Sequence, residues 1–354
     1  VDRQGLHRAW LARPCELHIS TDPPALMEIF RYEERGRRLV PCLVTGASSP
    51  WTGSLKPGSY LIKIQVPSGC VQLPLLLERG QDPRFVHLPL PPLGPEDCLV
   101  AAGPYAEGDE QAPEGLPERI RTLPTFVVRK FPMRVREYFD FLNGLIAEGR
   151  MEEAELHAPF SEFAGFGSPG GPCWQWEGGR MVPGKDERGL LLPEQPIMQI
   201  RWDDAVAATA WFAKQSGLPW RLPYEREWEK AARGVDGRRW PWGNYFLPVW
   251  AAVADFSSET PSRQVVDSFP VDESPYGMRG AAGNIREWCL DQYHRQEDAD
   301  GKPVNLYPDL RMVRGGGYYN TAEYARVGAR RADAPGHHRD SIGFRMFRPL
   351  ADPG

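Results

Sequence analysis

Most of the chain beyond residue 97 lacks the repeating apolar patterns that regular helices and sheets require. Two long segments, 155–200 and 236–280, are rich in Pro and Gly and show few positions with the period of a strand or a helix. Pro removes a backbone donor and Gly adopts conformations that other residues avoid, so both interrupt regular structure. We therefore expect these segments to form ordered loops on a scaffold, which restricts the chain to loop-rich folds.

Three segments nevertheless carry the signals of helices. Residues 133–149 and 201–219 place apolar side chains three and four positions apart, and each ends on or just after a Gly. Residues 223–234 open on Pro, with Glu early, Arg late and Gly at the end, which is the usual order at the two ends of a helix. We expect three short helices among the loops.

Residues 1–95 have a different pattern of apolar and turn-forming residues from the rest of the chain. Short apolar runs such as CELHIS, SYLIKIQV and VQLPLLLE alternate with turn sequences such as DPP, KPG and PSG. Regular short strands between Pro- and Gly-containing turns are typical of a small β-sandwich-like domain. The stretch LPPLGPEDC reads as a linker, so we expect one domain over 1–95 and a second over 96–354.

Composition excludes some classes of function. The net charge of −5 argues against a general nucleic-acid-binding protein. No apolar run approaches the roughly 18 residues that a membrane-spanning helix needs. The chain begins at Val1 rather than at Met, so we expect its natural start to lie upstream.

Four motifs follow one another in the second domain. They are RLPYEREWEKAARG, RRWPWGN, SPYGMRGAAGNIREWCLD, and VRGGGYY followed by SIGFRMFRP. Together they resemble the formylglycine-generating enzyme family, also called the sulfatase-modifying factor family, whose usual forms include R-L-P-T-E-A-E-W, G-N-x-W-E-W, R-G-G-S-W and G-F-R. The resemblance covers about residues 97–349. It implies an α+β fold of the C-type lectin type, irregular and loop-rich, behind the small all-β domain.

The motif GNIREW is similar to a calcium site of that family. The side chains of Asn284 and Glu287 lie close in sequence to the carbonyls of Gly283 and Ile285, and four hard oxygens at this spacing suit Ca²⁺. The resemblance therefore implies a possible Ca²⁺ cofactor. The alternative is a turn whose Glu287 pairs with an arginine.

The family's copper chemistry is not expected in this chain. Active members of the family oxidise a substrate cysteine with copper bound by two cysteines five residues apart, just after R-G-G-S. Thiolates are the ligands that soft Cu(I) prefers. Here those positions hold Asn320 and Ala325, and no cysteine follows Cys289. We expect no copper and no enzyme activity.

The C-terminal segment also resembles the variable proteins of diversity-generating retroelements. In these proteins a segment of a C-type lectin domain is rewritten by adenine-directed mutagenesis, and the region 314–345 fits their pattern without a gap. Arg326, Arg330, Pro335 and the motif IGFR fall on constant positions. The resemblance implies that the ligand-binding, variable positions are Tyr319, Asn320, Thr321, Tyr324, Ala329, Arg331, Ala332, Asp333, Ala334, His337, Arg339, Asp340 and Ser341.

The genetic code gives an independent test of this interpretation. Randomised adenines in AAC or AAT codons cannot produce Lys, Glu, Gln, Met or Trp. These five types make up 66 of the 354 residues, yet only Glu323 belongs to them within 317–342. The deficit favours diversification.

The sequence therefore predicts a non-catalytic protein that binds an unknown protein or other macromolecule through a diversified surface. Tyr and small polar residues suit such a surface because they combine contact area with adaptable hydrogen bonding. Two alternatives stay open, a catalytically lapsed scaffold in a kinase-linked signalling protein and a metal-dependent oxidase. The expected location is the cytoplasm, with display at a cell surface as the alternative.

Overall fold

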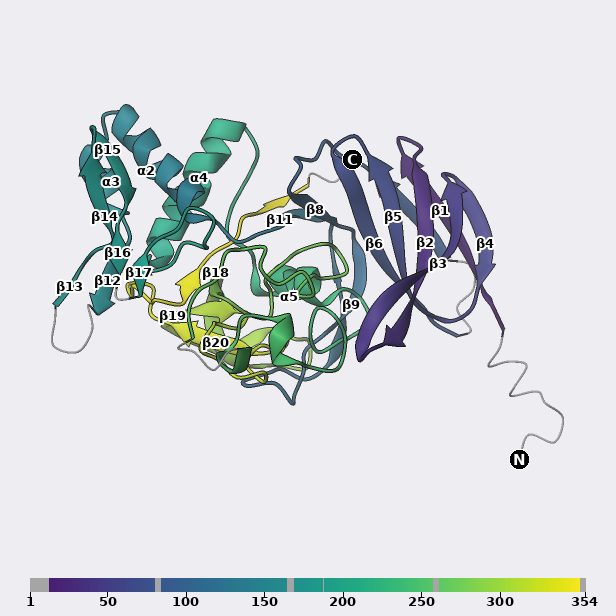
Figure 1. The fold of residues 1–354 in the computed structure, drawn as a ribbon. Coiled ribbons are helices and arrows are strands. Elements are labelled where there is room, and N and C mark those ends of the chain that lie inside the picture. The colour runs from purple at the N-terminus through teal and green to yellow at the C-terminus, as the bar shows by residue number, and fades with distance from the viewer. Residues whose placement is uncertain (1–12, 80–83, 164–168, 187, 257–260, 351–354) are drawn as a thin grey trace.

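The computed structural model of the chain describes residues 13–79, 84–163, 169–186, 188–256 and 261–350 (Figure 1). Strands make up the first of these ranges. Helices and loops join them further along the chain.

The N-terminal region consists of two small sheets. Its strands are β1 (Cys15–Asp22), β2 (Leu26–Arg35), β3 (Arg38–Ser48), β4 (Trp51–Leu55), β5 (Gly58–Val66), β6 (Gly69–Leu77) and β7 (Arg84–Pro89). One sheet has the order β4-β1-β7 and the other β3-β2-β5-β6. Alternate side chains of β1 and β5, including Leu17 and Ile62, are completely buried in one apolar cluster. The predicted all-β region is confirmed. Strand β4 was not among the expected strands, because Pro50 and Gly53 favour a turn there.

All three predicted helices are present. The helices are α2 (Val135–Ala147), α3 (Met151–Leu156), α4 (Trp202–Ser216) and α5 (Glu225–Arg233). The short helix α3 was not predicted, since six residues are too few to show a period. At the start of α2 the carboxylate of Glu137 accepts a hydrogen bond from the backbone N–H of Arg134, which fixes where that helix begins.

The remaining elements are short, except for two long strands near the C-terminus. They are β8 (Asp97–Val100), β9 (Gly103–Glu107), β10 (Arg119–Leu123), β11 (Phe126–Arg129), β12 (Phe160–Phe163), β13 (Pro169–Pro172), β14 (Trp174–Glu177), β15 (Arg180–Pro183), β16 (Lys185–Asp186), β17 (Gly189–Leu190), η1 (Pro248–Trp250), η2 (Ala254–Phe256), β18 (Arg286–Glu297), β19 (Pro303–Arg314), β20 (Arg330–Asp333), β21 (Ile342–Gly343) and β22 (Phe347–Pro349). We expected residues 155–200 to form loops, but three two-stranded hairpins lie there. Strands of two to four residues are too short for an alternating pattern to be recognised.

The centre of the second region is a four-stranded sheet with helix α5 beside it. The sheet has the order β20-β19-β18-β21. Trp228 from α5, Tyr293 from β18 and Met312 from β19 meet in one buried cluster. In Figure 1 this centre lies between the N-terminal sheets and the end formed by α2, α4 and the hairpins. The result is the loop-rich α+β architecture that the sequence predicts.

Polar contacts join the N-terminal sheets to the second region. The hydroxyl of Ser59 donates to Asp236 at 2.6 Å, and the guanidinium of Arg238 lies 4.5 Å from the centre of the Tyr32 ring. The domain boundary at residues 95–96 stays a prediction.

Within the described ranges, no helix combines the length and apolar character that crossing a bilayer would take.

Candidate ligand-binding surface

Arginines at the constant positions of the C-terminal segment point inward and form buried ion pairs. Arg314, at the end of β19, is completely buried and donates to Glu225 at 2.9 Å and to Glu229 at 2.7 Å, both on α5. Arg330, at the start of β20, is 1% exposed and donates to both oxygens of Glu225, at 2.5 and 3.1 Å. One carboxylate on α5 therefore anchors two points of the segment.

Two further arginines complete what we call the buried frame, defined as Arg314, Arg326, Arg330 and Arg345 with their carboxylate partners. Arg326 donates to both oxygens of Asp109, at 2.8 and 2.7 Å. Arg345 is completely buried and donates to Glu287 at 2.8 Å. Because buried charges must be paired to be tolerated, these contacts fix the backbone on both sides of the predicted variable positions.

The shared carboxylate of Glu225 is strongly affected by this environment. Burial raises the pKa of Glu225, but the positive charges of Arg330 and Arg314 outweigh that effect and hold the pKa at about 2. Glu225 therefore stays ionised at neutral and moderately acidic pH.

Ten of the predicted variable side chains reach the surface and three do not. Tyr319 and Thr321 are exposed, and Tyr324, Arg331, Ala332, Asp333, Ala334, His337, Arg339 and Asp340 are partly exposed. Asn320, Ala329 and Ser341 are only 8%, 3% and 1% exposed. A partner can touch the first ten, whereas the three buried side chains support the loops from beneath.

Contacts within this surface hold it in one arrangement. The Asp333 carboxylate accepts hydrogen bonds from Arg339 at 2.8 Å and contacts the ring of His337 at 2.5 Å. The guanidinium of Arg331 lies 5.5 Å from the centre of the Tyr324 ring. The Tyr319 hydroxyl lies 2.9 Å from that of Ser341. These contacts bring together side chains from 319 to 341.

A residue that the sequence reasoning did not select lies under this surface. Arg286, at the start of β18, is 4% exposed and donates to the Tyr319 hydroxyl at 3.2 Å and to Asn320 Oδ1 at 2.6 Å. No ion pair joins it to a carboxylate of the described residues, although the nearby charge of Asp333 acts on it, and burial lowers the pKa of this guanidinium. The sequence contains the signal, since the family motif G-N-x-W-E-W has an aromatic residue where this chain has Arg286.

Three of the four oxygen-bearing groups of the predicted calcium site have other partners. Both oxygens of Glu287 face Arg345, and the carboxylate also accepts from the indole N–H of Trp228 at 2.8 Å. Asn284 uses both ends of its amide on the backbone of Gln264, at 2.9 Å each. Gly283 accepts from the N–H of Ile285 at 3.0 Å. This geometry favours the alternative, an arginine-paired turn, because the side-chain oxygens of Glu287 and Asn284 already accept hydrogen bonds within the protein. Ca²⁺ usually takes six to eight oxygen ligands, waters included.

The two positions that hold copper in active relatives have no thiol. Ala325 is completely buried and has no ligating atom. The Asn320 side-chain oxygen accepts from Arg286 and also from the backbone N–H of Gly317 at 2.8 Å. Across the described ranges, no group of three or more His, Cys, Asp and Glu side chains is placed to hold a metal ion.

Replacing Glu225 tests the buried frame. The folded pKa of about 2 lies below the ordinary value of 4.5, so the stabilisation from Glu225 is complete above pH 4.5 and disappears as the pH falls towards 2. We expect Glu225→Gln to lower the free energy of unfolding by about 3 kcal/mol at pH 7. The difference from the native protein, measured by urea unfolding, decreases on acidification. Glu323→Gln, at an exposed position, is the control, and equal stability of the two variants would contradict the frame.

Calcium dependence tests the geometry around Glu287. After dialysis against EDTA, we expect added CaCl₂ to leave the melting temperature unchanged, because Arg345 already neutralises the carboxylate. Glu287→Gln lowers the melting temperature with or without Ca²⁺. A Ca²⁺-induced rise that disappears in Glu287→Gln would establish the calcium site instead.

Comparison with known proteins agrees with this architecture. Residues 89–350 match the family described as the sulfatase-modifying factor enzyme 1-like domain. "Inactive C-alpha-formylglycine-generating enzyme 2" of Mus musculus is 29% identical over 344 residues, which cover 86% of this chain and 96% of that protein. The formylglycine-generating enzyme of Thermomonospora curvata is 28% identical over 294 residues, 72% of this chain and 92% of the enzyme.

A kinase and two solved structures are also similar to parts of the chain. The serine/threonine-protein kinase Pkn1 of Chlamydia trachomatis is 29% identical over 273 residues, 73% of this chain but only 39% of the kinase. PvdO from Pseudomonas aeruginosa superposes with a TM-score of 0.55 at 21% identity, covering 72% of this chain and 94% of PvdO. Treponema denticola variable protein 1 superposes with a TM-score of 0.51 at 20% identity, covering 72% and 95%. These two likenesses show the fold. The family match, together with the buried frame and the ordered motifs, shows that the chain belongs to the formylglycine-generating enzyme (sulfatase-modifying factor) family.

Proposed function

We propose that this protein is a non-catalytic ligand-binding protein whose C-terminal surface is diversified by a diversity-generating retroelement. The proposal rests on a difference in burial between the constant and the variable positions of the retroelement pattern. Arg314, Arg326, Arg330 and Arg345, which the retroelement pattern keeps constant, are at most 8% exposed. Ten of the thirteen positions that the pattern varies are accessible. The retroelement pattern was matched on residue types alone, without any information on burial. That its constant arginines are buried and most of its variable positions accessible is therefore independent support.

The division by burial suits a surface that changes while its fold does not. Buried ion pairs carry the backbone geometry, and the accessible side chains contribute little to stability. Tyr319 and Tyr324 offer large contact areas with few rotatable bonds, while Arg331, Asp333 and Arg339 supply polar contacts. A protein or other macromolecular partner is the kind of ligand that such an extended surface recognises. We expect neither a nucleic acid nor a membrane as its partner, and we expect the cytoplasm as its location.

The loss of the copper ligands supports a non-catalytic role. Asn320 and Ala325 stand where the active family has cysteines, and Asn320 is already engaged by Arg286. The mouse relative, named as inactive, is an example of a family member without the activity. The Treponema variable protein shares the fold, and at 20% identity it supports only the suitability of this scaffold.

A second candidate is a catalytically lapsed scaffold in a kinase-linked signalling protein. The similarity to the chlamydial kinase favours it, because 73% of this chain matches part of that longer protein. In that case the 319–341 surface would be a fixed docking site with one partner, and it would not vary between related genomes.

The DNA around the gene separates the two candidates. We expect a near-copy of the codons for residues 314–345 within a few kilobases, beside a reverse transcriptase gene, differing almost only where the copy has adenine. Its mismatches should fall on the ten accessible positions more often than on Asn320, Ala329 and Ser341. The absence of any such repeat in the complete flanking sequence would reject diversification and favour the fixed scaffold.

Substitutions at the surface should alter binding without unfolding the protein. We expect Tyr319→Ala, Tyr324→Ala and His337→Ala to change the free energy of unfolding by about 1 kcal/mol or less, since each side chain is at least partly solvated. Arg330→Met is the matched frame variant and should cost about 3 kcal/mol by leaving Glu225 underpaired. Urea unfolding measures stability, and selection from a displayed library randomised at the ten positions measures binding. Loss of folding in the three surface variants would contradict the proposal.

A further inference from the structure

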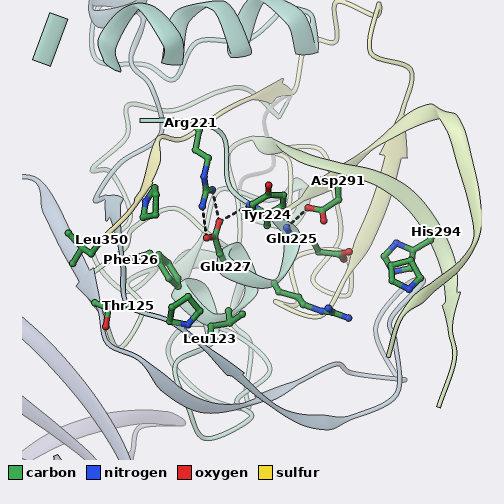
Figure 2. Close-up of a pocket in the computed structure, with 14 residues that line it drawn as sticks. Leu123, Thr125, Phe126, Arg221, Tyr224, Glu225, Glu227, Asp291, His294 and Leu350 are labelled. Atoms are coloured by element: carbon green, nitrogen blue, oxygen red, sulfur yellow. Dashed lines mark hydrogen bonds and ion pairs between the residues drawn. The ribbon is translucent and has the colours of Figure 1, made fainter. Parts of the chain in front are cut away.

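A cavity of about 440 Å³ lies away from the predicted variable positions, none of which lines it. It is lined by the segment between β10 and β11, the start of α5, the middle of β18, the start of β19 and the end of β22 (Figure 2). This volume falls in the range of about 300–1,000 Å³ that is usual for small-molecule sites.

Much of the cavity wall is apolar. Leu123 and Phe126 come from the two ends of the β10–β11 connection, Leu350 follows β22, and the ring of Tyr224 stands at the start of α5. Figure 2 shows Leu350, Phe126 and Leu123 at one end and Asp291 and His294 at the other. The cavity therefore has an apolar end and a polar end.

The arginines that line the cavity are already neutralised. Arg221 donates to both oxygens of Glu227, at 2.7 Å each, as the dashed lines in Figure 2 show. Arg226 donates to Glu107 at 2.9 Å and to Glu297 at 2.8 Å. Because each guanidinium has its carboxylates within the protein, neither is available to an anionic ligand.

The negative charge of Glu225 is also neutralised, since its carboxylate lies between Arg314 and Arg330 in the buried frame. His294, at the polar end, contacts Arg330 at 3.1 Å and Glu297 at 3.5 Å. The titratable groups around the polar end are thus paired with one another, with one exception.

The exception is Asp291 on β18. No cationic group of the described residues lies within ion-pairing distance of its half-buried carboxylate. One oxygen, Oδ2, accepts the backbone N–H of Glu225 at 2.6 Å. Burial, followed by the nearby charge of Glu225, raises the pKa of Asp291 to about 6. A positive charge in the cavity would remove the cost of keeping this carboxylate ionised.

The bond to Glu225 gives Asp291 a structural role, because it satisfies an N–H in the first turn of α5. That role needs one acceptor oxygen and no charge, so asparagine could fill it. It does not explain an ionisable group at the end of an apolar cavity.

From the size of the cavity, its apolar end and the uncompensated carboxylate, we propose that it binds a small organic cation. The ligand class is a primary or secondary ammonium carried on an apolar or aromatic body. The ammonium donates to Asp291, and the body lies along Leu123, Phe126 and Leu350. This site is independent of the diversified surface and would be common to all variants of it.

The test uses the full chain and three probes of similar shape and different charge. Calorimetric titration at neutral pH with tryptamine, tryptophol and indole-3-acetate compares an ammonium, a hydroxyl and a carboxylate on one indole body. We expect tryptamine to bind at least about tenfold more tightly than tryptophol, with no binding of indole-3-acetate. Equal binding of tryptamine and tryptophol, or no binding of either, would overturn the proposal.

Variants and a bound structure locate the site. Asp291→Asn keeps the acceptor for α5 and should abolish the preference for tryptamine, whereas Asp140→Asn, on the exposed face of α2, should retain it. If Asp291→Asn does not fold, the crystal structure of the native chain with bound tryptamine shows where the ammonium lies. An ammonium nitrogen within hydrogen-bond distance of Asp291 supports the proposal, and tryptamine bound elsewhere overturns it.

Discussion

The C-terminal half of this structure depends on one carboxylate held between two guanidinium groups. Glu225 begins α5, and through Arg314 and Arg330 it fixes both the end of β19 and the start of β20. Fifteen residues, 315–329, lie between those two anchors and carry no regular helix or strand. A loop of that length normally loses much conformational entropy on ordering. Here its ends are set by charges that cannot separate without leaving an ion unpaired in the interior.

This arrangement separates what holds the fold together from what faces solvent. Arg326, four residues before Arg330, extends from the same loop to Asp109, so the loop is tied at a third point between its ends. The accessible side chains between the ties, such as Tyr319, Thr321 and Tyr324, can then change in size and polarity without breaking these ion pairs. The buried contacts of this segment therefore run to α5 and Asp109, and they support the accessible side chains from beneath.

How much the sequence predicts follows from the physical origin of each signal. Helices α2, α4 and α5 were found because their periodicity and end signals extend over many residues, whereas α3 and hairpins β12–β17 are too short to show a pattern. The ordered motifs predicted the lectin-type architecture and the constant arginines. Which loop side chains are buried could not be predicted, because Asn320, Ala329 and Ser341 differ from their accessible neighbours only through tertiary contacts. The partner of Glu287 could not be predicted for the same reason. Whether its carboxylate binds Ca²⁺ or pairs with an arginine depends on Arg345, which lies 58 positions away in the sequence.

The position of Arg286 beneath Tyr319 has a consequence for the electrostatics of the surface. Its guanidinium lies 5.5 Å from the centre of that ring and donates to its hydroxyl, so the tyrosine lies against a charge that forms no ion pair among the described residues. If a single codon change replaces Tyr319 with a small residue, water and ligands reach that charge. The surface then gains a positive site although no charged residue has been added. If position 319 varies as we propose, its side chain would thus set the local potential of the surface by covering or uncovering the guanidinium of Arg286.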